Sequence, residues 1–89
     1  MEILHTASAG TQNKEDLVVT IEPYPVGIEI EVKSTVGSLF ADELKKSVAE
    51  ELAKLNITAC KVLVNDFSAL DYVVRARTEA AAKRALGVA

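Results

Sequence analysis

The chain offers few side chains that could carry out catalysis or bind a metal. His5 is the only histidine and Cys60 the only cysteine among the 89 residues. A metal site needs several histidine, cysteine or carboxylate ligands at suitable spacing, and none gather around His5. Cys60 falls on the apolar side of an expected strand, where a buried thiol behaves as a small hydrophobe. We therefore predict no metal site, an exposed His5 and a Cys60 that belongs to the core.

The hydroxyl and carboxyl groups do not form a catalytic motif either. Ser38, Ser47 and Ser68 have no histidine partner in the pattern, and the four glycines are scattered instead of forming a phosphate-binding loop. The acidic residues fall on positions expected to face solvent. The sequence therefore indicates a small domain that is not an enzyme by itself.

One polar stretch looks suited to presenting a group to a partner. "AGTQNKED", Ala9 to Asp16, stands directly before the first strongly apolar run and has Lys14 near its centre. Residues 1–16 show no clear apolar period, which predicts a mobile N-terminal arm or loop. Residues 17–89 then form the single domain that a chain of this length supports.

Composition and charge exclude several classes of protein. The net charge is −3 and the pI about 5.1, whereas binding to nucleic acid needs clustered lysine and arginine. No apolar run reaches the roughly 20 residues of a membrane-spanning helix, and the N-terminus lacks the pattern of a signal peptide. A single cysteine cannot form an internal disulfide. We expect a cytoplasmic protein that binds neither nucleic acid nor membrane.

Alternating apolar residues predict four strands. Residues 17–22 and 28–33 alternate on either side of "PYPVG", which predicts a hairpin with one wet face. Two further runs, "TACKVLVND" and "YVVRAR", alternate in the same way. The second places Arg75 and Arg77 on the exposed face, where we expect them to pair with Glu29 and Glu31 if the strands are neighbours.

Helical periods occupy the remaining segments. An apolar stripe with three- and four-residue spacing predicts a long helix, capped by Ser34 or Thr35 and ending near Asn56. A second helix, "EAAAKRAL", is expected after a cap at Thr78 and before Gly87. The stripe of the first helix comprises Val36, Phe40, Leu44, Val48, Leu52 and Leu55.

The predicted fold class is α+β. The order of elements is ββαββα, which favours a two-layer sandwich in which a four-stranded sheet carries two helices on one face. The opposite face of the sheet is expected to be open.

Two segments give the chain a resemblance to a known family. The pattern "AGT....D" is followed by an alternating strand, and "ND.SALDYVVRARTEAAAKRA" runs from Asn65 to Ala85. Together they resemble the acyl carrier protein, or gamma subunit, of citrate lyase, over almost the entire chain. The acyl carrier subunit of malonate decarboxylase is a more distant likeness. The second segment is fairly specific, with Ala69, Leu70, Asp71, Arg75, Ala76, Arg77, Glu79 and Ala80.

The resemblance implies a noncatalytic carrier subunit of a citrate lyase type complex. In the family, a serine of the N-terminal loop is joined by a phosphodiester to a phosphoribosyl-dephospho-CoA arm, whose thiol carries acetyl and citryl groups. It implies alpha and beta type lyase subunits and a holo-carrier transferase as partners. Gly10, Thr11, Asp16 and position 14 are the implied cofactor-binding positions.

This chain departs from the family at the attachment position. The family loop usually reads Ala-Gly-Thr-Leu-Glu-Ser, then one residue and Asp, and here Lys14 replaces the serine. An amine cannot form that phosphodiester, which requires a hydroxyl oxygen. Two hypotheses follow: a diverged paralogue without the arm that acts as a structural or regulatory interaction module, or a lyase carrier whose attachment is altered or displaced to Ser8 or Thr11.

Overall fold

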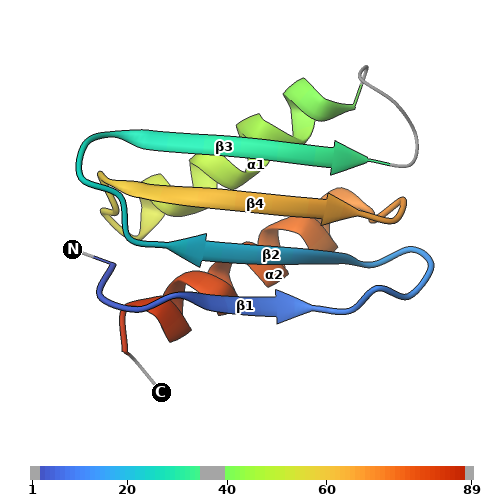
Figure 1. Ribbon diagram of the computed structural model, residues 1–89. Helices are drawn as coiled ribbons and strands as arrows, with labels where there is room; N and C mark the ends of the chain where they lie inside the picture. The colour runs from blue at the N-terminus through green and yellow to red at the C-terminus, as the bar shows by residue number, and fades with distance from the viewer. Residues whose placement is uncertain (1–2, 35–39, 88–89) are drawn as a thin grey trace.

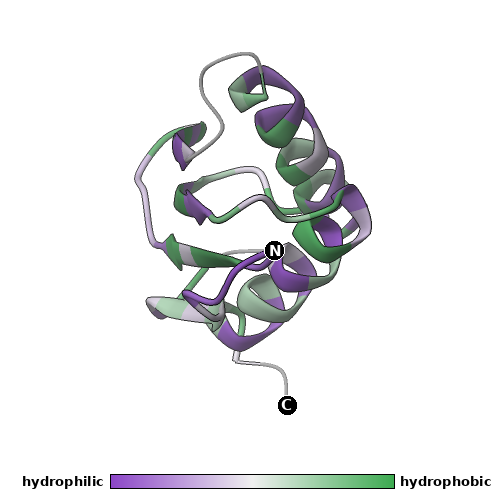
Figure 2. Ribbon diagram, turned by 90° about the vertical axis from the view of Figure 1, so that its right-hand side faces the viewer, coloured by the Kyte–Doolittle hydropathy of each residue, from purple (hydrophilic) through white to green (hydrophobic). Residues whose placement is uncertain are grey.

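The computed structural model describes residues 3–34 and 40–87, which form two layers. A four-stranded sheet forms one layer, and two helices pack on one of its faces (Figures 1 and 2). This arrangement confirms the predicted α+β class and the predicted sheet with two helices. The elements in chain order are β1 (Ala7–Gly10), β2 (Leu17–Glu22), β3 (Ile28–Ser34), α1 (Ala41–Lys54), β4 (Cys60–Asp66) and α2 (Asp71–Ala85).

The strand order is β1-β2-β4-β3, so the predicted hairpin of β2 and β3 is wrong. β4 lies between them, antiparallel to β2 and parallel to β3 (Figure 1). The segment from β3 through α1 to β4 is a β-α-β unit, whose helix provides the long connection that parallel strands require. The proline-rich segment 23–27 therefore spans the width of β4 instead of closing a tight turn.

The fourth strand lies at the N-terminus, where the sequence predicted none. Ala7–Gly10 forms β1 and pairs antiparallel with β2, from Ala7 opposite Ile21 to Gly10 opposite Val18. Residues 7–10, which were expected in a mobile arm, therefore form a strand of the sheet. The predicted domain boundary at residue 16 falls inside the hairpin of β1 and β2. Only Ala9 is buried in the core, so this short strand has almost no apolar alternation to reveal it.

The predicted strand "YVVRAR" and the helix after it are one helix, α2. Thr78 is not a cap but an interior residue, whose Oγ1 donates to the carbonyl of Val74 at 2.8 Å. Gly87 follows the helix with a φ of 80°, as predicted for a helix terminator. Asn56, with a φ of 57°, likewise follows α1.

The start of α1 also differs from the prediction. Ser34 ends β3 and donates its hydroxyl to Asp66 Oδ2 at 3.0 Å. The N-cap of α1 is Phe40, which makes no side-chain capping hydrogen bond. Thr35 and Val36 lie outside the described residues. Phe40, expected in the apolar stripe, is 51% exposed.

The core lies between the sheet and the helices. The alternation predicted for β2 and β4 is confirmed, because one set of side chains from each strand is buried in the core shared with the helical layer. Cys60 is fully buried, and desolvation raises the pKa of its thiol to about 11. The central members are Leu17, Val19, Ile21, Val48, Leu52, Cys60, Val62, Val64, Val74, Ala81, Ala82 and Ala85.

Candidate functional site

The candidate site is the loop of residues 11–16 that joins β1 to β2. It lies at the same end of the sheet as the connection from β4 to α2 (Figure 1). Side chains of residues 11–15 are exposed, whereas Asp16 at the base is buried. The loop therefore projects from a fixed base into solvent.

Asp16 anchors the loop to helix α2. Its Oδ1 accepts hydrogen bonds from the Leu17 amide at 2.8 Å and Arg77 Nε at 3.1 Å. Its Oδ2 accepts from Thr11 Oγ1 at 2.7 Å and from a terminal nitrogen of Arg77 at 2.9 Å. The Arg77 hydrogen bonds, followed by that of Thr11, lower the pKa of Asp16 from 3.8 to about 2. The carboxylate thus holds both ends of the loop and α2 together.

Backbone hydrogen bonds join this loop to the one after β4. The Glu15 amide donates to the Phe67 carbonyl at 2.7 Å, and the Phe67 amide donates to the Asp16 carbonyl at 2.9 Å. Asp66, which is 3% exposed, accepts from the Ala69 amide at 3.0 Å in addition to Ser34. Two loops that are distant in sequence therefore form one braced end of the domain.

The entry to the loop requires a glycine. Gly10 has a φ of 109°, a conformation that residues with a side chain rarely adopt. A Cβ placed on Gly10 would lie 1.8 Å from the carbonyl oxygen of Leu17. The absence of a side chain therefore permits the two hairpin strands to approach closely at the loop base.

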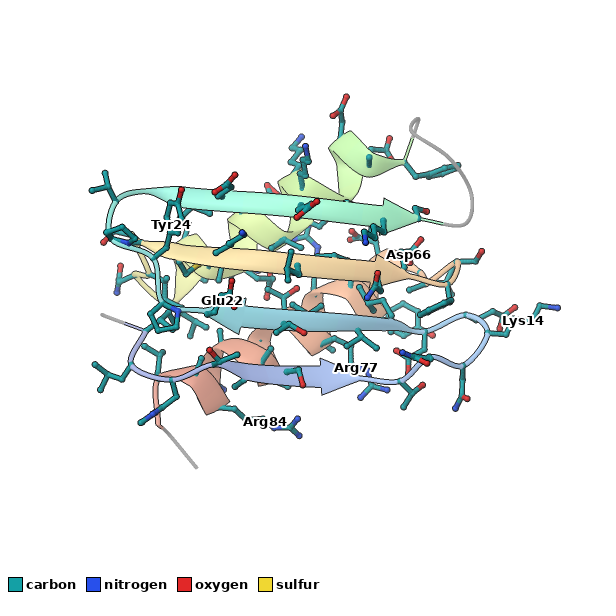
Figure 3. The ribbon with its side chains drawn as sticks, in the orientation of Figure 1. Lys14, Glu22, Tyr24, Asp66, Arg77 and Arg84 are labelled. Atoms are coloured by element: carbon teal, nitrogen blue, oxygen red, sulfur yellow. The ribbon has the colours of Figure 1, made fainter. Side chains whose placement is uncertain are left out.

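Lys14 projects from the tip of the loop, away from the sheet (Figure 3). The structure gives its Nζ no hydrogen bond or ion pair with the described residues. Of the four implied cofactor-binding positions, Gly10, Thr11 and Asp16 form the loop base and Lys14 stands apart from them. Arg77 and Phe67 complete the base, and sequence reasoning missed their part in it.

The predicted charge pairs between the arginines and Glu29 or Glu31 are wrong. Arg75 lies on α2 and pairs with Asp71 at 2.7 Å, Glu50 at 2.8 Å and Glu51 at 3.2 Å. Arg77 pairs with Asp16 in the loop. Both arginines lie on the helical layer, so they cannot reach the exposed face of β3.

Other candidate groups do not converge on the loop. His5 is exposed, as predicted, and its amide donates to the Ala85 carbonyl at 3.2 Å. The described residues contain no group of three or more histidine, cysteine or acidic residues placed to hold a metal. Within the same residues, none of the helices has the length and apolar character needed to cross a membrane.

A cavity of about 340 Å³ opens beside the braced end. It lies where the first turns of α1 and α2 meet the loop after β4. Phe40 and Leu70, which are 51% and 60% exposed, flank it. Its apolar lining comprises Phe40, Leu44, Ala69, Leu70 and Val74.

The fold and the projecting loop define a small α+β domain, and comparison with known proteins places it in a family. The family model described as "Malonate decarboxylase delta subunit (MdcD)" matches residues 4–85. The chain therefore belongs to this family. Together with the curated relatives below, the match confirms the predicted resemblance.

Curated relatives carry the name citrate lyase acyl carrier protein. The relative from Haemophilus influenzae is 44% identical over 85 residues, which are 96% of this chain and 88% of the relative. That from Halothermothrix orenii is 39% identical over 85 residues, covering 96% and 90% of the two chains. That from Oenococcus oeni is 42% identical over 86 residues, covering 97% and 89%.

A solved structure shares the fold. A chain in the crystal structure of a Pseudomonas malonate decarboxylase hetero-tetramer in complex with malonate superposes with a TM-score of 0.77. It is 27% identical, and the match covers 94% of this chain and 87% of that one.

Proposed function

We propose that this protein is a noncatalytic acyl carrier subunit of a citrate lyase type complex in the cytoplasm. The observation that carries the proposal is the exposed loop of residues 11–16, braced at its base in a chain of the carrier family. A carrier contributes by holding an acyl group near its partner enzymes, which raises its effective concentration. It needs a fixed body and a projecting attachment point instead of acid and base groups of its own.

The proposed partners are alpha and beta type lyase subunits. The names of the relatives and the hetero-tetrameric neighbour support an assembly of this kind. We expect a tagged chain, isolated from its native cells, to copurify with such subunits in fixed proportion. Recovery of the chain without any lyase or decarboxylase subunit would count against the proposed function.

The residues of the loop do not fit the family's phosphoribosyl-dephospho-CoA arm. Its phosphodiester requires a hydroxyl oxygen, and position 14 presents an amine. The Thr11 hydroxyl donates to Asp16 and accepts from the Asn13 amide at 3.3 Å, so it is held in the loop base. Ser8 lies within β1, outside the loop. These positions support a chain that does not receive this arm.

Restoring a hydroxyl at position 14 should restore the modification. We expect Lys14→Ser to gain a mass corresponding to the CoA-derived arm when incubated with a family holo-carrier transferase and its activated substrate. The unchanged protein and a Lys45→Ser variant, altered at an exposed position of α1, should gain none in intact-mass measurements. If the unchanged protein gained the same mass, the loop would accept the CoA-derived arm with Lys14 in place, which contradicts the argument above.

A diverged carrier paralogue without the prosthetic group is the second candidate. Lys14 favours it, because the altered residue stands at the implied attachment position while the loop base is retained. Such a chain would act as a structural or regulatory interaction module. Native protein that copurifies with lyase subunits and has its unmodified mass would support this candidate over a working carrier.

A further inference from the structure

Lys14 is the nucleophile that the loop makes available. The exposed side chains around it are the amides of Gln12 and Asn13 and the carboxylate of Glu15, which are poor nucleophiles. Thr11 is also exposed as a residue, but its hydroxyl hydrogen is directed to Asp16 Oδ2 at 2.7 Å. A primary amine is intrinsically able to attack an activated carbonyl once it loses a proton. The nucleophile that this loop offers is therefore the amine of Lys14.

The structure presents this amine in a defined place. Glu15 follows Lys14 with a φ of 65°, a left-handed conformation that turns the chain at the tip. Its amide is fixed by the Phe67 carbonyl, and the next residue, Asp16, is fixed by Arg77. The backbone is thus fixed at Glu15, directly after Lys14, while the Lys14 side chain extends into solvent. A modifying enzyme could therefore reach it.

We propose that Lys14 Nζ is an acylation site, which carries an acyl group derived from a carboxylic acid through an amide bond. This inference rests on the proposed carrier function and specifies how its attachment point works. The carboxyl group must arrive activated, as an acyl adenylate or an acyl thioester, supplied by a ligase or acyltransferase. The acylated lysine would extend the attached group beyond the loop tip.

The bonds formed and broken balance whether the donor is an acyl adenylate or an acyl thioester. The ammonium form of Lys14 first releases a proton to a base on the modifying enzyme. The nitrogen lone pair then forms a bond to the carbonyl carbon, and the bond from that carbon to the adenylate oxygen or thioester sulfur breaks. AMP or a thiolate leaves with the electron pair, and the second nitrogen proton goes to the thiolate or to solvent.

Exposure favours an amide over a catalytic Schiff base. Lysines that form Schiff bases are usually activated by desolvation or by a nearby cation. Lys14 is exposed and lies outside the lining of the 340 Å³ cavity. An amide does not depend on a protected pocket, because it persists in water once formed.

The test uses the chain purified from its native cells together with the proteins that copurify with it. Intact mass followed by tandem mass spectrometry of its peptides should show an adduct on Lys14 that survives neutral hydroxylamine and phosphodiesterase. Lys14→Arg, which keeps the positive charge, should lose the adduct completely while retaining the lyase-type subunits. Lys45→Arg should retain both. Adding unmodified protein to native extract with or without ATP then distinguishes the acyl adenylate donor, which needs ATP, from a preformed thioester.

The outcomes separate this inference from the proposed function. Complex formation without an adduct on Lys14, or with an adduct on a hydroxyl, overturns the acylation site and leaves the carrier subunit in place. Absence of both lyase-type subunits and adduct overturns the proposed function as well. An adduct on Lys14 in the complex supports both.

Discussion

Replacing Gly10 with alanine should cost about 3 kcal/mol or more of the free energy of unfolding, because a new Cβ collides with the opposite strand. The Cβ would lie 1.8 Å from the Leu17 carbonyl oxygen and 2.9 Å from its carbonyl carbon. Both are backbone atoms, so no side-chain rotation relieves the clash. The positive φ of Gly10 adds conformational strain. Urea denaturation measures the loss, and hydrogen exchange should show the amides between β1 and β2 opening first.

Gly27→Ala is the matched control for this effect. Gly27 also has a positive φ, of 75°, but an added Cβ there meets nothing within 4 Å. Only the left-handed backbone penalty of about 1 kcal/mol is expected. Equal losses in the two variants would show that the close approach of Gly10 to Leu17 does not determine the stability of the hairpin.

Helix α2 shows why a short alternating segment can mislead. Tyr72, Val74 and Ala76 would share one face of a strand, but a run of six residues cannot separate a period of 2 from one of 3.6. The longer window settles the matter, because the buried positions recur at spacings of three and four residues over the whole segment. They are Val74, Thr78, Ala81, Ala82 and Ala85.

Local sequence patterns could not predict the order of the strands in the sheet. Alternation identified the strands β2, β3 and β4, since it depends on each strand alone. Their inward faces are buried in β2 and β4 but only partly buried in β3, where Ile28 is 39% exposed. The insertion of β4 between β2 and β3 depends on how α1 crosses the sheet, which no short segment encodes. β1 was missed because Ala7–Gly10 is held by pairing with β2 and contains small residues only.

Part of the candidate site could likewise be predicted from the sequence, and part could not. The loop and its departure at Lys14 could be identified from the sequence, through the family pattern. The partners of Asp16 could not, because Arg77 is 61 positions away and its local pattern places it on the exposed face of a strand. With α2 helical, Arg77 reaches the loop base, where Asp16 anchors the loop to the helix.

Replacing Asp16 with asparagine should therefore cost about 2 kcal/mol at neutral pH. The change removes the negative charge that accepts two hydrogen bonds from Arg77 and one from Thr11. The Asp16 side chain is 13% exposed and that of Arg77 is 40% exposed, so solvent screens this ion pair in part, though less than a pair in which both side chains are exposed. Glu15→Gln, which removes an exposed charge from the same loop, should change stability by no more than about 0.5 kcal/mol.

The pH dependence of this loss tests its electrostatic origin. The pKa of Asp16 is about 2 in the folded protein, against an ordinary value of 3.8, so the unfolded chain takes up a proton first as the pH falls. This difference contributes about 2 kcal/mol of stability that is complete above about pH 5 and declines as the pH approaches 2. Urea denaturation of the unchanged protein and Asp16→Asn should give free energies of unfolding that differ at pH 7 and converge near pH 2. A difference that stays constant across this range would assign the loss to altered packing, and would show that the charge of Asp16 does not hold the loop to α2.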